Sequence, residues 1–148
     1  MYTPCSTFRR TPAERADQEL SWRRGDQAFF AAGACHILAF AFQHLHPDAG
    51  FSVIGLRKIG EAWVSHAYVS DGRWAFDHDG WTPEEELLAV TTAAEPAPGW
   101  QRLVIDTDLE TFCREHSSRP PHLFAHPPWQ RAYDYIDRFD PPEGYARA

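Results

Sequence analysis

Apolar and polar residues recur along the chain with two different periods, and together these predict helices and strands. The segment from about Ala34 to His46, which ends before Pro47, would place apolar side chains on nearly all sides of a helix. A helix that is apolar all round is typical of a buried position. The run from Phe51 to Ile59 is rich in β-favouring residues and predicts a strand.

A hairpin is predicted next, with Ala62–Ser70 and Arg73–Asp77 as its strands and Asp71-Gly72 as a strong turn signal. A two-residue loop, or a four-residue loop over 70–73, makes the numbers of paired residues sum to 143, whereas a three-residue loop does not. Under that register His66 lies directly opposite Asp77, within reach of a hydrogen bond. One face of the hairpin is then apolar and predicted to pack on the core (Ala67, Val69, Trp74, Phe76). The other is mainly polar and predicted to open onto a site (His66, Tyr68, Ser70, Arg73, Asp77).

The remaining pattern predicts four further helices and one further strand. A helix over Thr11–Arg24 has the residues of a capping box at its start, and a short helix begins within Thr82–Glu85. A strand is expected over Gln101–Ile105, a helix from Thr107 to about Glu115, and an amphipathic helix over Trp129–Arg138. Helices gathered around an antiparallel sheet indicate a single α+β domain over residues 1–148, with residues 1–11 expected to be flexible.

Composition and charge narrow the functional classes. With 148 residues, 43% of them hydrophobic, the chain can bury one core. A formal charge of −7 argues against nucleic-acid binding. No apolar run approaches the roughly 18 residues of a membrane span, and the N-terminus has no apolar signal-peptide core. Three widely separated cysteines predict no disulfide framework. We therefore expect a cytoplasmic protein, with secretion as an effector by a route without a cleaved signal left open.

The candidate chemistry centres on Cys35, at the start of the predicted buried helix. Small residues before it leave room for a substrate, and the helix start favours the thiolate. His66 and Asp77 have the order expected of a base and the carboxylate that orients it. A buried cysteine is also a common inert core residue. Asp79 competes with Asp77 if the register shifts, although its place beside Gly80 predicts a turn residue.

Other residues receive secondary roles. The backbone N–H of Cys35 and the Gln27 side chain are the expected oxyanion donors, and Tyr68 and Trp81 are expected at the substrate cleft. His36 should point about 100° away from Cys35 around the helix. Cys5 and Cys113 are expected to be a tail thiol and a packing thiol. Zinc held by Cys35, His66 and Asp77 is chemically possible, but no paired metal motif supports it, so neither metal nor cofactor is expected.

The segments Gly33–Ala39 and His66–Asp77 resemble the papain-like cysteine enzymes in the order of Cys, His and Asp. The closest branches are the transglutaminase-like, arylamine-acetyltransferase-like and bacterial papain-fold toxin branches, and the resemblance spans roughly Gln27 to Trp81. The chain departs from them in a short Cys-to-His interval and in His36, which replaces the Trp that often follows the cysteine. The extra domains of the acetyltransferases are missing, so acetyl-CoA use is not supported.

The resemblance implies a papain-like fold, in which a buried helix carrying the Cys packs on a sheet carrying His and Asp. It also implies a triad of Cys35 as nucleophile, His66 as base and Asp77 as orienter. The expected activity is attack on an amide or thioester carbonyl of a protein, peptide or small substrate through an acyl-enzyme. Hydrolysis or deamidation is favoured over acyl transfer. A non-catalytic binding protein that uses its aromatic C-terminal third (Trp129, Tyr133, Tyr135) is the main alternative, and a zinc hydrolase is the third.

Overall fold

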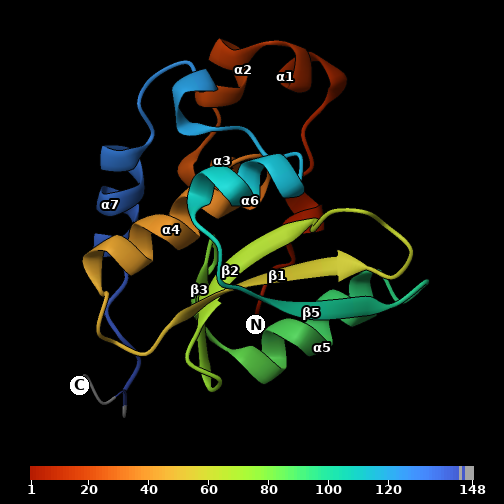
Figure 1. The fold of residues 1–148 in the computed structure, drawn as a ribbon, viewed down its shortest axis with the longest axis vertical. Coiled ribbons are helices and arrows are strands. Elements are labelled where there is room, and N and C mark those ends of the chain that lie inside the picture. The colour runs from red at the N-terminus through yellow and green to blue at the C-terminus, as the bar shows by residue number, and fades with distance from the viewer. Residues whose placement is uncertain (144, 146–148) are drawn as a thin grey trace.

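A computed structural model describes residues 1–143 and 145, and within them one five-stranded antiparallel sheet is flanked by helices (Figure 1). The strand order is β4-β3-β2-β1-β5. The strands are β1 (Ser52–Lys58), β2 (His66–Ser70), β3 (Trp74–Asp77), β4 (Gly80–Pro83) and β5 (Trp100–Ile105). The helices are α1 (Pro12–Ala16), α2 (Gln18–Trp22), α3 (Asp26–Ala31), α4 (Cys35–Leu45), α5 (Glu84–Ala94), α6 (Leu109–Glu115) and α7 (Trp129–Asp137), with short 3-10 turns at Cys5–Phe8 and Pro121–Leu123. The predicted α+β class is confirmed.

Helix α4 lies on one face of the sheet and α5 on the other (Figure 1), and buried side chains form a core on each face. Helix α4 packs on one face against Ala67, Val69 and Phe76, and α3, α6 and α7 surround it. Its residues from His36 to Phe42 are all buried, as the all-round apolar pattern predicts. The smaller core on the other face contains Tyr68 of β2 and Leu87 of α5.

The hairpin forms, but the predicted register is wrong by two residues. Val69 pairs with Phe76 and Ser70 with Ala75, so paired numbers sum to 145. The loop lies one residue later than predicted, because the backbone N–H of Asp71 donates to the carbonyl of residue 74 at 3.2 Å and leaves residues 72 and 73 in the turn. The Asp71 carboxylate accepts hydrogen bonds from the backbone N–H groups of residues 73 and 74, at 2.8 and 2.7 Å. A shift of two residues keeps every side chain on its face. His66 and Asp77 are therefore diagonal neighbours rather than direct partners.

The mainly polar face of the hairpin does not open to solvent as expected. His66, Tyr68, Ser70 and Asp77 are all buried. Tyr2 covers part of this face, with only 3% of its surface exposed. Polar side chains on a strand predict an open face only if nothing else packs there, and here the chain terminus and α5 do.

The N-terminal segment is therefore packed, not loose as expected for residues 1–11. The Tyr2 hydroxyl donates to Asp77 Oδ2 at 2.5 Å, and the backbone N–H of Thr3 donates to Asp79 Oδ2 at 2.9 Å. Burial of a tyrosine ring and two hydrogen bonds to carboxylates offset the entropy lost by ordering a few residues.

Several element boundaries also differ from the prediction. The Thr11–Glu14 capping box is present, but the helix stops at Asp17, whose side chain caps α2. Strand β4 and helix α3 were not predicted. Thr82 belongs to β4, so α5 begins only at Glu84 and has no side-chain cap. Within the described residues, no helix is long and apolar enough to cross a membrane.

Candidate active site

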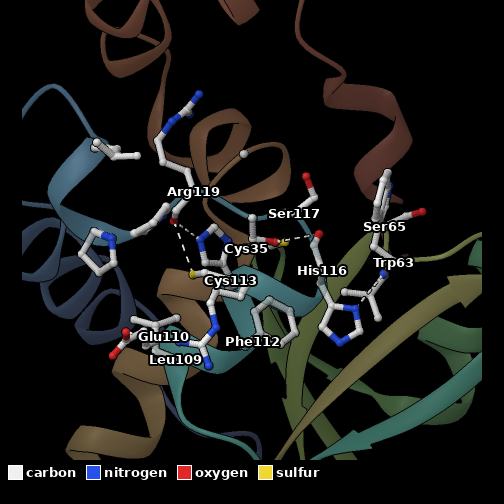
Figure 2. A pocket seen from close by; sticks show the side chains of 18 of the residues that line it. Cys35, Trp63, Ser65, Leu109, Glu110, Phe112, Cys113, His116, Ser117 and Arg119 are labelled. Carbon is white, nitrogen blue, oxygen red and sulfur yellow. Dashed lines mark hydrogen bonds and ion pairs between the residues drawn. The ribbon is translucent and has the colours of Figure 1, made fainter.

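A cavity of about 1050 Å³ lies where the start of α4 meets the start of β2 (Figure 2). Cys35, His36 and His66 line its inner end. Residues between Leu109 and Leu123, from α6 and the loop after it, line much of the rest, together with Arg10, Gly33 and residues 63–65 before β2. The structure thus brings the predicted nucleophile and the predicted base to one cavity.

Cys35 is the first residue of α4 and is partly accessible. Gly33, two residues earlier, has φ +107°, a conformation that favours glycine and turns the chain into the helix. Burial alone would raise the pKa of the Cys35 thiol, but the imidazoles of His36 and His66 outweigh it and lower that pKa to about 5. The thiol is therefore predominantly a thiolate at neutral pH.

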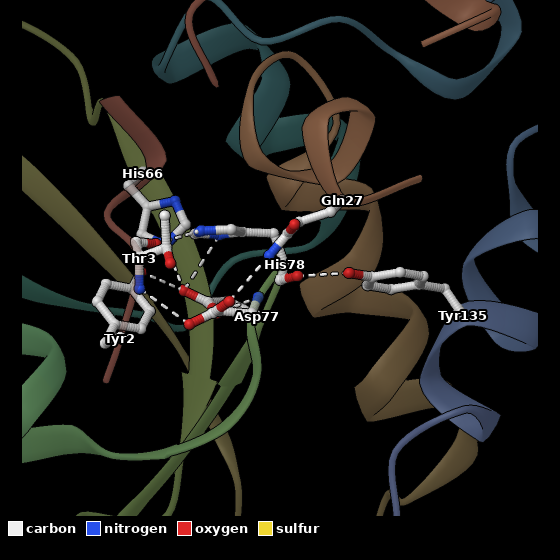
Figure 3. A network of polar contacts seen from close by, with 8 residues as sticks. Tyr2, Thr3, Gln27, His66, Asp77, His78 and Tyr135 are labelled. Carbon is white, nitrogen blue, oxygen red and sulfur yellow. Dashed lines mark hydrogen bonds and ion pairs between the residues drawn. The ribbon is translucent and has the colours of Figure 1, made fainter. Parts of the chain in front are cut away.

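His66 and Asp77 form a buried pair (Figure 3). The His66 Nε2–H donates to Asp77 Oδ2 at 2.9 Å. The other ring nitrogen, Nδ1, is buried and has no hydrogen-bond partner within the described residues. Burial opposes a charged ring, yet the charges and hydrogen bonds of Cys5, Asp77 and Cys35 raise the pKa of His66 well above its usual value. The ring is thus oriented by the carboxylate, with Nδ1 left for a thiol.

Asp77 is held by more than His66 (Figure 3). Its Oδ2 also accepts from the Tyr2 hydroxyl and lies 3.4 Å from His78 Nδ1, and its Oδ1 accepts from the backbone N–H of Asp79 at 2.9 Å. Burial would raise the pKa of Asp77, but the His78 charge and the bonds from His66 and Tyr2 lower it to about 2. The carboxylate therefore stays ionised through the physiological pH range.

Asp79, the competing carboxylate, is placed elsewhere. It lies with His78 in the turn between β3 and β4, where Asp77 pairs with Gly80. Its Oδ1 accepts from the Gln27 side-chain amide at 2.9 Å, and its Oδ2 holds Thr3. The turn position predicted for Asp79 is confirmed, and the carboxylate on His66 is that of Asp77.

His36 is the residue that sequence reasoning missed. It is 2% exposed, and its Nε2–H donates to the carbonyl of Arg119 at 2.7 Å. Burial would lower the pKa of His36, but Cys113, Cys35 and that carbonyl raise it to about 9. The expectation that His36 points away from the thiol is wrong, because His36 interacts with Cys35. Neighbours on a helix differ by 100° in direction, but both of these side chains line the same cavity at the helix start.

The other two cysteines also lie close to this site. Cys5 interacts with the His66 ring from the N-terminal segment, so it is not a remote tail thiol. Cys113 of α6 is buried, and its thiol donates to the Arg119 carbonyl at 3.7 Å, which fits the expected packing role. His66 thus has a thiol from each of two chain segments beside it.

The three predicted accessory residues do not line this cavity. Gln27 is exposed and bound to Asp79, which puts its amide away from Cys35. Tyr68 is fully buried in the core under α5. Trp81 packs against aromatic rings of the larger core, including Phe42 and Phe76, because it projects from β4 toward α4. None of the three is placed to contact a substrate at Cys35.

The residues that could hold a metal ion differ from the expected set of Cys35, His66 and Asp77. Within the described part of the chain, His66, Asp77 and His78 offer ligand atoms within 4.8 Å of one another, and Cys35 is not among them. Asp77 Oδ2 already accepts from His66 and from Tyr2, and His78 Nε2 bonds the Thr3 carbonyl at 2.8 Å. His78 Nδ1 lies 3.4 Å from Asp77 Oδ2. The cluster is accounted for as a hydrogen-bond network.

No family model matches this chain, and neither a curated protein nor a solved structure matches it. Function must therefore be inferred from the geometry and chemistry of the site itself.

Proposed function

We propose that this protein is a cysteine-dependent enzyme that acts on an amide or thioester carbonyl through an acyl-enzyme. The observation that carries the proposal is the Cys35 thiol beside a His66 ring whose other nitrogen is bonded to Asp77, at the inner end of a cavity. The arrangement has the roles of a Cys-His-Asp triad. It is the arrangement that a papain-like enzyme would use, and we propose that superfamily for the chain.

The reaction follows from these residues. The Cys35 thiolate attacks the carbonyl carbon, and the backbone N–H at the start of α4 is placed to stabilise the resulting oxyanion. The C–N or C–S bond then breaks, and the leaving amine or thiol takes the proton of the His66 imidazolium. Neutral His66 next removes a proton from water, which attacks the thioester and releases the acid and the thiolate. We favour hydrolysis or deamidation, and an amine in place of water gives acyl transfer.

The non-catalytic alternative receives less support. It relied on exposed aromatic residues in the C-terminal third, yet Tyr135 is buried and its ring packs on Phe30 and Phe139. Trp129 and Tyr133 are partly buried and stack on each other. The aromatic side chains of α7 therefore serve the core more than a docking surface.

Acylation by p-nitrophenyl acetate tests the proposal without knowledge of the substrate. We expect acetyl transfer to Cys35, seen by mass spectrometry of peptides, with nitrophenol release that C35S abolishes and H66A slows at least tenfold. H122A is the matched control, because His122 lines the same cavity but is exposed and contacts neither Cys35 nor Asp77. Acetylation that H66A leaves unchanged, or that occurs equally on Cys5 and Cys113, would overturn the proposal.

A further inference from the structure

Basic side chains dominate the charged groups of the Cys35 cavity, although the whole chain carries −7. Three arginines line it (Arg10, Arg114, Arg119), and Glu110 is the one carboxylate among the described lining residues. Glu110 is already bonded to Arg114 at 3.3 Å. No carboxylate among the described lining residues is therefore left to pair with Arg10 or Arg119.

Of these two arginines, Arg10 gives the stronger indication of a bound anion. Its guanidinium lies against Gly33, where a Cβ would be 3.2 Å from Cζ and 3.2 Å from Nη1. Nη1 is buried and has no hydrogen-bond partner within the described residues. The Arg10 charge contributes to lowering the pKa of Glu14, but the Glu14 carboxylate is bonded to Arg24 and to the backbone of Thr11. A buried guanidinium N–H without an acceptor costs free energy unless a ligand supplies one.

The two cations also repel each other. Burial lowers the pKa of Arg10, the Arg119 charge lowers it further, and the Cys35 thiolate acts in the opposite direction. The Arg119 guanidinium lies 5.4 Å from the centre of the Phe124 ring, and the ring attracts the cation but carries no negative charge that would neutralise it. An anion bound between Arg10 and the thiol site would relieve this repulsion and satisfy the free donors.

We propose that the acyl substrate of Cys35 carries a carboxylate close to the reacting carbonyl, and that Arg10, supported by Arg119, binds it. This inference rests on the proposed function for the identity of the reacting group. The planar guanidinium offers a pair of N–H donors that match a carboxylate. Gly33 allows that guanidinium to approach the start of α4, so the anion would lie beside the nucleophile.

Two alkylating reagents of nearly the same size test the charge preference. Iodoacetate is an anion and iodoacetamide is neutral, and with both the thiolate forms an S–C bond as iodide leaves. The quantity measured is the ratio of the two rate constants at Cys35, identified by mass spectrometry of peptides. N-acetylcysteine under the same conditions supplies the reference ratio. Because both reagents need the thiolate, a change in its pKa cancels in the ratio.

We expect the ratio for wild-type Cys35 to exceed the reference about tenfold. It should fall toward the reference in R10Q and several-fold in R119Q, while R10K should keep part of it. R9Q is the matched control: it removes the same charge one residue away, where Arg9 is bonded to Glu95 at 2.7 Å outside the cavity. Melting curves identify any variant that fails to fold, and R119Q then serves in place of R10Q.

The outcomes separate this proposal from the proposed function. A wild-type ratio equal to the reference, or one that neither R10Q nor R119Q lowers, would overturn the anion site even if acetylation of Cys35 succeeds. Failure of acetylation would overturn the enzyme proposal, and with it the acyl group of the ligand, but not the anion site, because the ratio can be measured on a slow thiol as well.

Discussion

The pH dependence of Cys35 alkylation tests the proposed triad most directly. The perturbation is the removal of the His66 ring in H66A, compared with the wild type from pH 5 to 9 with iodoacetamide. His66 and His36 lower the pKa of the Cys35 thiol to about 5. The rate should therefore rise with pH through about 5 and then level off, whereas an ordinary thiol continues to gain rate until about pH 8.5.

The magnitude depends on two opposing effects. At pH 7 Cys35 is almost fully ionised and an ordinary thiol is about 3% ionised, a gain of roughly 30-fold. A thiolate whose pKa is about 3.5 units lower is, however, roughly 25- to 60-fold less nucleophilic. The two effects nearly cancel at pH 7. At pH 5.5, where about three quarters of Cys35 but only about 0.1% of an ordinary thiol is ionised, Cys35 should react roughly 10- to 30-fold faster.

In H66A the pKa of Cys35 should rise, so the rate at pH 5.5 should fall several-fold. At pH 9, where the thiol is ionised in both proteins, the more basic thiolate of H66A should react faster than that of the wild type. H36N should shift the profile in the same direction, since His36 also stabilises the thiolate. The assay is the rate of mass gain on the Cys35 peptide, with Cys5 and Cys113 as internal comparisons. A wild-type profile with a single inflection near pH 8.5, unchanged in H66A, would refute the reasoning.

Two further predictions concern stability. Y2F removes the hydroxyl that Tyr2 donates to buried Asp77, and we expect urea denaturation to show a loss of about 1–2 kcal/mol, whereas no loss would mean that the N-terminal segment is not anchored there. G80A should cost roughly 2–4 kcal/mol, because Gly80 has φ +76° and a Cβ would lie 2.5 Å from Phe139 Cδ1. G72A is its control: Gly72 has φ +95° but no atom within 4 Å, so it should cost only about 1 kcal/mol, and equal losses would contradict the predicted clash.

The chain's local patterns predict much of the fold. The buried α4, the strands β1 and β5 and the amphipathic α7 all follow from apolar spacing and turn residues near each element. The sequence also predicts which side chains share a face of the hairpin, because successive side chains of a strand point to opposite faces. That same period cannot distinguish registers that differ by two residues. In this register the Asp71 carboxylate accepts from the backbone N–H groups of residues 73 and 74, where the loop meets β3.

The site is predictable only where its contacts are local. His66 and Asp77 come from one hairpin, so their contact survives the register error. Cys35 is brought near His66 by the packing of α4 on the sheet. The apolar pattern of α4 predicts that the helix is buried, but not where its first residue lies on the sheet. His36 lies beside the thiol because the Arg119 carbonyl, 83 residues away in sequence, holds its ring there. No rule based on the spacing of residues in the sequence predicts that contact.

The position of the N-terminal segment is the clearest example of a feature that the sequence pattern does not predict. This segment also affects the orientation of His66. Tyr2 and Asp77 are 75 residues apart in sequence, yet the Tyr2 hydroxyl and the His66 ring share the same carboxylate oxygen. Thr3 accepts from His78 through its carbonyl and donates to Asp79 through its N–H, so it fastens the turn that follows Asp77. Residues that carry no periodic signal thus fix the carboxylate. Because that carboxylate fixes His66, the orientation of the His66 ring depends on the first residues of the chain.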